Sequence, residues 1–180
     1  VQPGVIQNGH VVGLAGMGFP TMASVIVGGD SARRQILNYA SSNEHSSPML
    51  STVKLLAPIA RPPKIVCIGL NYRDHAIESN MAIPEVPTVF CKFASSVIGP
   101  GGNVVLPKNS TKPDYEAEFA VVIGKGGRYI SPDNWQNHVF GYLNLNDVSA
   151  RDYQLATSQW VIGKTFDTFC PMGPFIATKD

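Results

Sequence analysis

Two glutamates two positions apart, Glu116 and Glu118, have the spacing in this sequence that most clearly suggests chemistry. In a β-strand, residues two apart project from the same face, so the two carboxylates would lie side by side. The same face continues with Ala120 and Val122, which are apolar and typical of a buried face. Two unpaired buried carboxylates repel each other, and a hard divalent cation would neutralise them. The alternative is a half-exposed strand whose polar face lies in water.

A third acidic residue, Asp147, lies where the sequence predicts that a strand passes into a helix. It is followed by Ser149 and Asp152, which have the S-x-x-D form of a capping box. Such junctions often hold ligands because backbone N–H groups are free there. Asp147 also fits an ordinary turn, since Asn-Asp pairs are common turn chemistry.

The elements that would position these carboxylates are mostly strands. An Asn-Gly signal predicts a hairpin over 5–12, and a continuous apolar run predicts a strand, buried on both faces, at 65–70. We expect a polar linker at 41–48 and helices at 31–40, 72–81 and 150–158. Further strands are expected at 88–93, 104–106, 115–123, 140–148, 160–162 and 175–178. Many strands, few helices and repeated glycine and proline turns predict a mostly β (α+β) fold.

Composition excludes several classes of function. The chain has 180 residues, of which 44% are hydrophobic and 15% charged, so it is globular and about one domain long. The net charge is +1 with no basic run, which argues against nucleic-acid binding. There is no run of about 18 apolar residues, so no membrane span is expected.

The three cysteines predict the compartment. Cys67, Cys91 and Cys170 are far apart, have no metal-ligand spacing and lie among apolar neighbours. We expect buried, reduced thiols in a reducing compartment. The first residue is Val1 with no basic region after it, so no signal peptide is expected. The cytoplasm is therefore predicted, with the mitochondrion as the alternative.

Several segments resemble one enzyme family. Residues 69–78 read GLNYRDHAIE and are similar to the GxNYxxHxxE opening of the fumarylacetoacetate hydrolase family. The segments that follow in the family's order are FCKFASS at 90–96 with GP and LP, DYEAE at 114–118, VIGK at 122–125, NDVSARD at 146–152, GKTFD at 163–167 and PMGP at 171–174. Each segment alone is weak, but their shared order covers the chain after Pro63.

The resemblance implies a fold and an assembly. We expect the family's mixed β-roll, with residues 1–60 as a small N-terminal domain and linker and residues 61–180 as the N-terminal portion of the catalytic domain. Family members continue beyond the position of Asp180, so a C-terminal part of the domain is expected to be missing. Family members are usually homodimers, so a homodimer is predicted.

The resemblance also implies a metal site. Glu116, Glu118 and Asp147 match the family's acidic ligands, which would hold Mg²⁺, with Mn²⁺ or Ca²⁺ as alternatives. This assignment agrees with the argument from strand spacing, since a hard cation prefers carboxylate oxygens.

Further matches imply catalytic and substrate-binding residues. His75 and Glu78 match a pair on a mobile lid, and their i, i+3 spacing places them on one helical face. Lys164 would contact substrate oxygens, and Arg151 with Gln154 would hold the substrate's carboxylate. Without the resemblance, His75 fits a surface histidine, Lys164 an exposed turn lysine, and Arg151 a surface partner of Asp152.

The family's chemistry predicts a metal-dependent hydrolase that cleaves a C–C bond of an acylpyruvate or a related 1,3-dicarbonyl or 2-oxo acid. The metal would stabilise the departing enolate, His75 assisted by Glu78 would take a proton from water, and Lys164 would stabilise the oxyanion. The same site would also suit oxaloacetate decarboxylation, or isomerisation or hydration of unsaturated 2-oxo acids. Two other classes stay open: a shortened, non-catalytic metal-binding paralogue, and a structural β-domain without metal.

Overall fold

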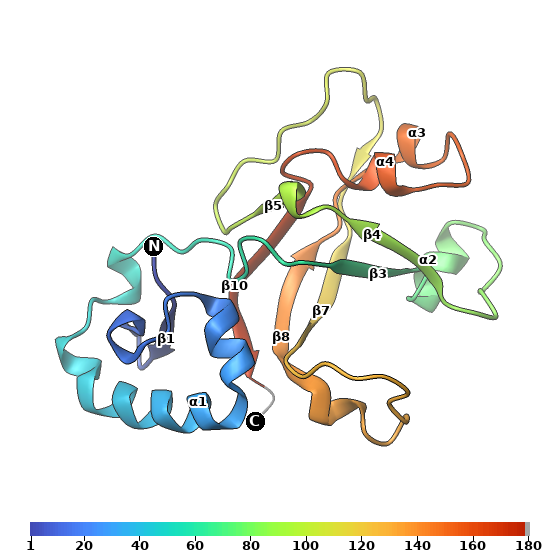
Figure 1. The fold of residues 1–180 in the computed structure, drawn as a ribbon. Coiled ribbons are helices and arrows are strands. Elements are labelled where there is room, and N and C mark those ends of the chain that lie inside the picture. The colour runs from blue at the N-terminus through green and yellow to red at the C-terminus, as the bar shows by residue number, and fades with distance from the viewer. Residues whose placement is uncertain (179–180) are drawn as a thin grey trace. The chain divides into compact units, whose positions relative to one another are not determined.

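The computed structural model describes residues 1–178 (Figure 1). Its contacts divide the chain into two compact units. The first unit comprises residues 1–59 and 119–144 and the described residues from 173 onward. The second unit comprises residues 60–118 and 145–172. No helix within the described residues is both long and apolar enough to cross a membrane.

The first unit begins with the predicted hairpin. Strands β1 (Gly4–Gln7) and β2 (His10–Gly13) pair antiparallel, with Val5 opposite Val12. The turn residues Asn8 and Gly9 both have positive φ, 45° and 82°, which explains the Asn-Gly sequence. The hairpin prediction is confirmed.

Helix α1 (Met22–Asn43) is longer than the predicted helix at 31–40. It starts at a capping box in which the Thr21 side chain accepts a hydrogen bond from the Ser24 N–H. Gly29, with φ 55° and ψ −146°, interrupts the helical geometry, so the glycine pair concealed the true start. The helix also takes the first residues of the predicted linker at 41–48. Its buried side chains form a core with Leu14: Val25, Ala32 and Ile36.

One sheet has four strands in the order β5 (Val97–Ile98), β10 (Cys170–Thr178), β8 (Val139–Asn146) and β7 (Ala117–Ile123). The predicted strands at 115–123, 140–148 and 175–178 are therefore confirmed, with shifted ends. Strand β10 pairs parallel with β5, and β7 lies at one edge of the order. The predicted strand at 104–106 is absent from the described structure, where those residues form no regular element.

The second unit contains the hairpin of β3 (Ile65–Gly69) and β4 (Thr88–Lys92), with helix α2 (Arg73–Glu78) in the connection. Strand β3 is not buried on both faces as predicted, because Val66 and Ile68 are 62% and 44% exposed. Its apolar run is continuous, but the hairpin is a separate two-stranded sheet with only one face turned inward.

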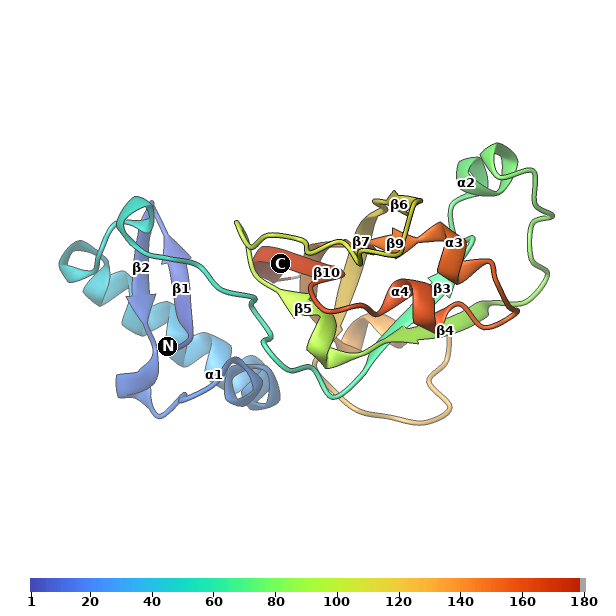
Figure 2. The ribbon, with the colours of Figure 1, turned by 90° about the horizontal axis from the view of Figure 1, so that it is seen from above.

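Two very short strands and two short helices complete the second unit. Strand β6 (Pro113–Asp114) pairs antiparallel with β9 (Ser149–Ala150), and α3 (Arg151–Gln154) follows β9 directly (Figure 2). The predicted helix at 150–158 is thus only one turn long. The predicted strand at 160–162 is wrong, because α4 (Val161–Lys164) begins there. Short 3₁₀ turns lie at Ala15–Met17, Glu44–Ser46, Leu50–Thr52, Ala94–Ser96 and Trp135–His138.

The predicted capping box at Ser149 and Asp152 is also wrong. The Ser149 hydroxyl donates to the Asp147 carbonyl, and the Asp152 carboxylate accepts hydrogen bonds from Ser110 and from the Thr111 N–H. Ser149 therefore hydrogen-bonds the chain just before it, and Asp152 serves a tertiary contact, so neither side chain caps the helix. Around them lies a core of Val148, Ala150 and Phe169.

Candidate active site

The two glutamates face inward, as their spacing predicted. Glu116 lies just before β7 with a side chain 12% exposed, and Glu118 is half-buried within the strand. The intervening Ala117 and the following Phe119 are exposed. Glu116 is tied to the end of β8, since its carbonyl accepts the Asp147 N–H at 2.9 Å and its own N–H donates to the Asn146 side chain at 3.1 Å.

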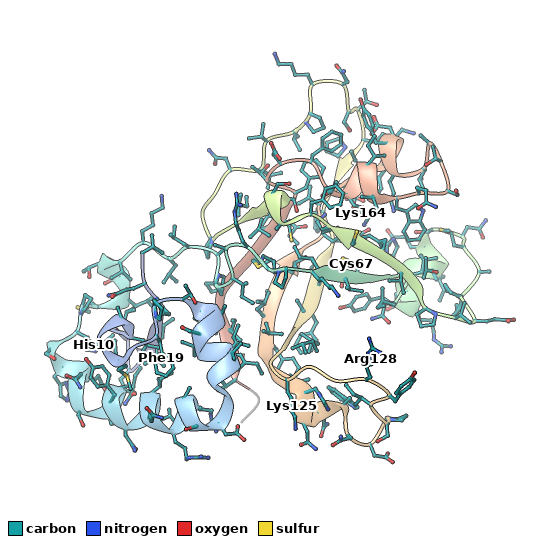
Figure 3. The ribbon with its side chains drawn as sticks, viewed as in Figure 1. His10, Phe19, Cys67, Lys125, Arg128 and Lys164 are labelled. Atoms are coloured by element: carbon teal, nitrogen blue, oxygen red, sulfur yellow. The ribbon has the colours of Figure 1, made fainter. Side chains whose placement is uncertain are left out.

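Asp147 and Glu116 converge on a buried lysine. The Lys164 ammonium lies 2.7 Å from Glu116 Oε2 and 2.9 Å from Asp147 Oδ2. Lys164 ends α4 and is 2% exposed, so the exposed turn lysine is excluded (Figure 3). Asp147 is 3% exposed, which excludes a simple surface turn residue. The structure thus brings together three of the side chains that the sequence singled out.

Arg151 borders this cluster and is held by two carboxylates. Its Nε and Nη2 donate to Asp114 Oδ2 at 3.0 and 2.8 Å, and its Nη1 lies 2.6 Å from Glu116 Oε1. Nη1 also donates to Gln154 Oε1 at 2.9 Å, so the two predicted substrate-binding residues are in contact. The surface pair of Arg151 with Asp152 is therefore not formed. Burial disfavours the ionised Asp114 and is the largest single effect, but the hydrogen bonds from Arg151 and the Tyr115 N–H, together with the charge of Arg151, outweigh it and lower the pKa of that carboxyl.

Helix α2 carries His75 and Glu78 as predicted, but in the described structure the two side chains are not in contact with each other in the way that the prediction requires. His75 is partly buried and Glu78 exposed, and no hydrogen bond or ion pair joins them among residues 1–178. The start of α2 does contact the acidic residues, because the side chain of Tyr72, just before the helix, hydrogen-bonds Glu118. The charge of His75 also helps to lower the pKa of the Asp114 carboxyl.

The cluster has an excess of negative charge. With His75 left out of the count, the carboxylates of Asp114, Glu116, Glu118 and Asp147 face the cations of Lys92, Lys164 and Arg151, four charges against three. Burial first, and then repulsion from Glu116 and Asp147, raises the pKa of the Glu118 carboxyl, against the opposing effects of Lys164 and Tyr72. An additional cation would relieve this repulsion.

The donor chemistry of the cluster fits a hard divalent cation, because carboxylate oxygens are its preferred ligands. In the described part of the chain, however, no three acidic, histidine or cysteine side chains are already arranged to hold a metal. The Lys164 ammonium lies between two of the carboxylates instead. A cation held by Glu116, Glu118 and Asp147 therefore requires these side chains to rearrange.

Sequence reasoning missed Lys92 and Asp114. Lys92 ends β4, is 2% exposed and lies 2.7 Å from Asp147 Oδ1. Its signal was available in the alternation of the strand, because Phe90 and Lys92 share the inward face of β4 and a lysine on an inward face needs a buried partner. Asp114 had no such signal, since it precedes β7 in an exposed two-residue strand.

The cysteines supply a prediction about reactivity. Cys170 is buried as expected, whereas Cys67 and Cys91 are only partly buried, because the β3–β4 hairpin is covered on one side. Burial raises the pKa of the Cys67 thiol to about 12 and that of Cys170 to about 11. At pH 8 both stay protonated, so alkylation by iodoacetamide is expected to be slower than for free cysteine by about tenfold or more. Peptide mass spectrometry over time measures this, and rapid labelling of either residue would contradict it.

Comparison with known proteins gives the family. The sequence model described as "Fumarylacetoacetate (FAA) hydrolase C-terminal" matches residues 64–180. The mitochondrial oxaloacetate tautomerase of Xenopus laevis is 48% identical over 154 residues, which cover 84% of this chain and 48% of that protein. One of two matching human mitochondrial oxaloacetate tautomerases is 52% identical over 132 residues, which cover 72% of this chain and 42% of that protein.

A solved structure supports the same conclusion. A probable 2-hydroxyhepta-2,4-diene-1,7-dioate isomerase from Mycobacterium abscessus matches with a TM-score of 0.79 at 36% identity, covering 99% of this chain and 61% of that one. This likeness confirms the expected α+β fold class. The chain spans about half the length of the curated relatives it matches. With the family model matched over residues 64–180 and the motifs in order, the chain belongs to the fumarylacetoacetate hydrolase family.

Proposed function

We propose that this chain carries the catalytic side chains of a metal-dependent enzyme that forms and stabilises the enolate of a small 2-oxo acid. The observation that carries the proposal is the buried Lys164 ammonium between Glu116 and Asp147, with the Arg151 guanidinium beside Glu116. Positive groups held by buried carboxylates are preorganised to meet negative charge as it develops on a substrate oxygen. Keto–enol tautomerisation of oxaloacetate is the reaction we favour, because the Xenopus and human relatives are named for it.

Arg151 and Lys164 have separate tasks in this proposal. Four of the five N–H donors of Arg151 are engaged within the described structure, which leaves one on Nη2 for a substrate carboxylate. Lys164 would neutralise the oxygen of the 2-oxo group as the neighbouring carbon loses its proton. That proton then moves to the oxygen, so the enol forms without any net change in atoms or charge.

Glu116, Glu118 and Asp147 would hold the divalent cation, Mg²⁺ or alternatively Mn²⁺ or Ca²⁺. When bound, such a cation supplies a Lewis acid that polarises the substrate's carbonyl oxygen. The carboxylates themselves would fix its position, and burial around Asp147 would keep bulk water away from it. We further propose the mitochondrion as the compartment, from the names of the same relatives, in place of the cytoplasm. The predicted homodimer stays a prediction.

Hydrolysis of the C–C bond of an acylpyruvate is the second candidate. It is favoured by the partly buried His75, which lies near enough to the Asp114 carboxyl to affect its pKa and which, in its neutral form, is a suitable base for activating water. The two candidates differ in product. Hydrolysis of acetylpyruvate releases pyruvate, whereas tautomerisation of oxaloacetate releases nothing and is followed by the ultraviolet absorbance of the enol.

The test measures both reactions on the whole chain, before and after EDTA and after Mg²⁺ or Mn²⁺ is restored. We expect turnover that EDTA removes and the metal restores. The double variant Glu116→Ala/Glu118→Ala should lose it, whereas Lys108→Met, which changes an exposed lysine in the same unit, should keep it. Turnover that is unaffected by EDTA, or that persists in the double variant, would overturn the proposal. Mn²⁺ binding without turnover of either substrate would indicate the non-catalytic paralogue.

A further inference from the structure

Lys92 connects three parts of the second unit through one atom. Its ammonium donates to Asp147 Oδ1 at 2.7 Å, to the Val148 carbonyl at 3.1 Å and to the Lys164 carbonyl. An ammonium has three N–H donors, so each of them has an acceptor. These acceptors belong to the segment after β8 and to the end of α4, while Lys92 itself ends β4.

The same strand contacts Lys164 a second time. The Phe90 ring lies two residues before Lys92 on β4, and the Lys164 ammonium is 5.3 Å from the centre of that ring. Phe90 in turn packs edge-on against Trp160, which precedes α4, with ring centroids 5.7 Å apart. Strand β4 thus contacts the main chain of Lys164 through Lys92 and its side chain through Phe90.

If Lys92 had a purely structural role, an apolar side chain would fill the same place with a smaller free-energy cost of burial. Burying an ammonium carries a large desolvation cost, which is offset only where hydrogen bonds and a counter-charge are well placed. The Lys92 ammonium has both, and they fall on the carboxylate and the lysine to which the proposed function assigns chemistry. The Asp147 carboxylate therefore presents one oxygen to Lys92 and keeps the other for Lys164.

We propose that Lys92 is a positioning residue of the active site, which fixes the orientation of the Asp147 carboxylate and the place of Lys164. Lys92 acts through these two residues and does not itself meet the substrate. The effect of Lys92 on catalysis rests on the proposed function. Its effect on Lys164 does not depend on any activity, because without Lys92 the Lys164 side chain is no longer held in its buried place.

The experiment compares the whole wild-type chain with Lys92→Met and, as a matched control, Lys108→Met. Each protein is treated briefly with acetic anhydride without metal, and acetylation of Lys164 is quantified by peptide mass spectrometry. We expect Lys164 acetylation to be at least about tenfold faster in Lys92→Met than in the wild type and unchanged in Lys108→Met. In Lys92→Met the Lys164 carbonyl loses its hydrogen bond, and the Asp147 carboxylate that pairs with the Lys164 ammonium is no longer fixed. Kinetics on the proposed substrate should show a fall in kcat of about tenfold or more with KM within about twofold.

Each outcome decides one of the two proposals. Lys164 protection equal to that of the wild type in Lys92→Met overturns the positioning role, whatever the activity shows. A wild type with no turnover but with Lys164 exposed in Lys92→Met overturns the proposed function and leaves the positioning role supported. Should circular dichroism show that Lys92→Met is unfolded, Lys92→Arg replaces it. Arg keeps the charge but cannot direct three bonds from a single nitrogen, so folded Lys92→Arg should show faster Lys164 acetylation, and unchanged protection there overturns the role.

Discussion

Replacing Asp147 with Asn is expected to lower the free energy of unfolding by about 3–5 kcal/mol, because it leaves the buried Lys92 ammonium without its counter-charge and the buried Lys164 ammonium with Glu116 alone. Asp147 pairs with Lys92 at 2.7 Å and with Lys164 at 2.9 Å, and both lysines are 2% exposed. Asn has nearly the same shape, so the change removes charge without creating a cavity. Urea unfolding followed by circular dichroism measures the loss.

The same change should lower turnover by more than the roughly 10–100-fold typical of residues that only support a metal ligand, since Asp147 is itself a proposed ligand. The matched control is Asp167→Asn, which changes an exposed carboxylate of the same unit. It should leave both stability and turnover close to those of the wild type. A folded Asp147→Asn protein within about 1 kcal/mol of the wild type would show that the buried ion pairs contribute little, a loss no larger than that of a typical point mutation.

Replacing Gly163 with Ala should be the most disruptive change of a single methyl group in the second unit. An added Cβ would lie 2.6 Å from Gln154 Cα and 2.7 Å from the Ala150 carbonyl oxygen, and closer still to the Gln154 nitrogen. These are backbone atoms, which cannot rotate away as a side chain would. We expect α4 to be pushed off α3 and the free energy of unfolding to fall by roughly 3 kcal/mol or more, at the upper end of overpacking effects.

Because Gly163 immediately precedes Lys164, any form of the variant that folds should also have lost turnover. Gly126→Ala is the comparison, since an added Cβ there meets no atom within 4 Å. It should unfold at a urea concentration close to that of the wild type. Equal stability of Gly163→Ala and Gly126→Ala would mean that the contact between α3 and α4 yields easily, contrary to the geometry described above.

The strand that carries the glutamates could be predicted because its signal is local. From Glu118 to Val122, inward-facing and outward-facing positions alternate, and this pattern depends only on neighbouring residues. The same is true of the Asn-Gly turn of the first hairpin. The family resemblance added Lys164 and Arg151, whose burial and partners depend on segments far apart in the sequence. No spacing within GKTFD indicates that its lysine meets a carboxylate 48 positions earlier.

The errors also have physical causes. The apolar run at 160–162 fits either a strand or a helix, and the close packing of Gly163 against α3 selects the helix. Ser149 and Asp152 have the spacing of a helix cap, but Ser149 hydrogen-bonds the carbonyl of Asp147 and Asp152 accepts a tertiary hydrogen bond from Ser110. The inward position of Lys92 follows from the alternation of β4, but its partners could not be predicted, because they lie 55 to 72 positions away.

The contacts of Lys92 have a consequence for how this fold tolerates change in its β3–β4 connection. Shifting the pairing of β3 and β4 by a single residue would turn Lys92 outward and Cys91 inward, since neighbouring strand residues face opposite sides. A one-residue shift between β3 and β4 would break the three hydrogen bonds of the Lys92 ammonium, so these bonds fix the strand register even though no tight turn joins the two strands. Residues 79–87, between α2 and β4, are therefore not needed to set the pairing of the two strands, so their length and sequence can diverge between relatives while Lys92 stays aligned with Asp147 and Lys164.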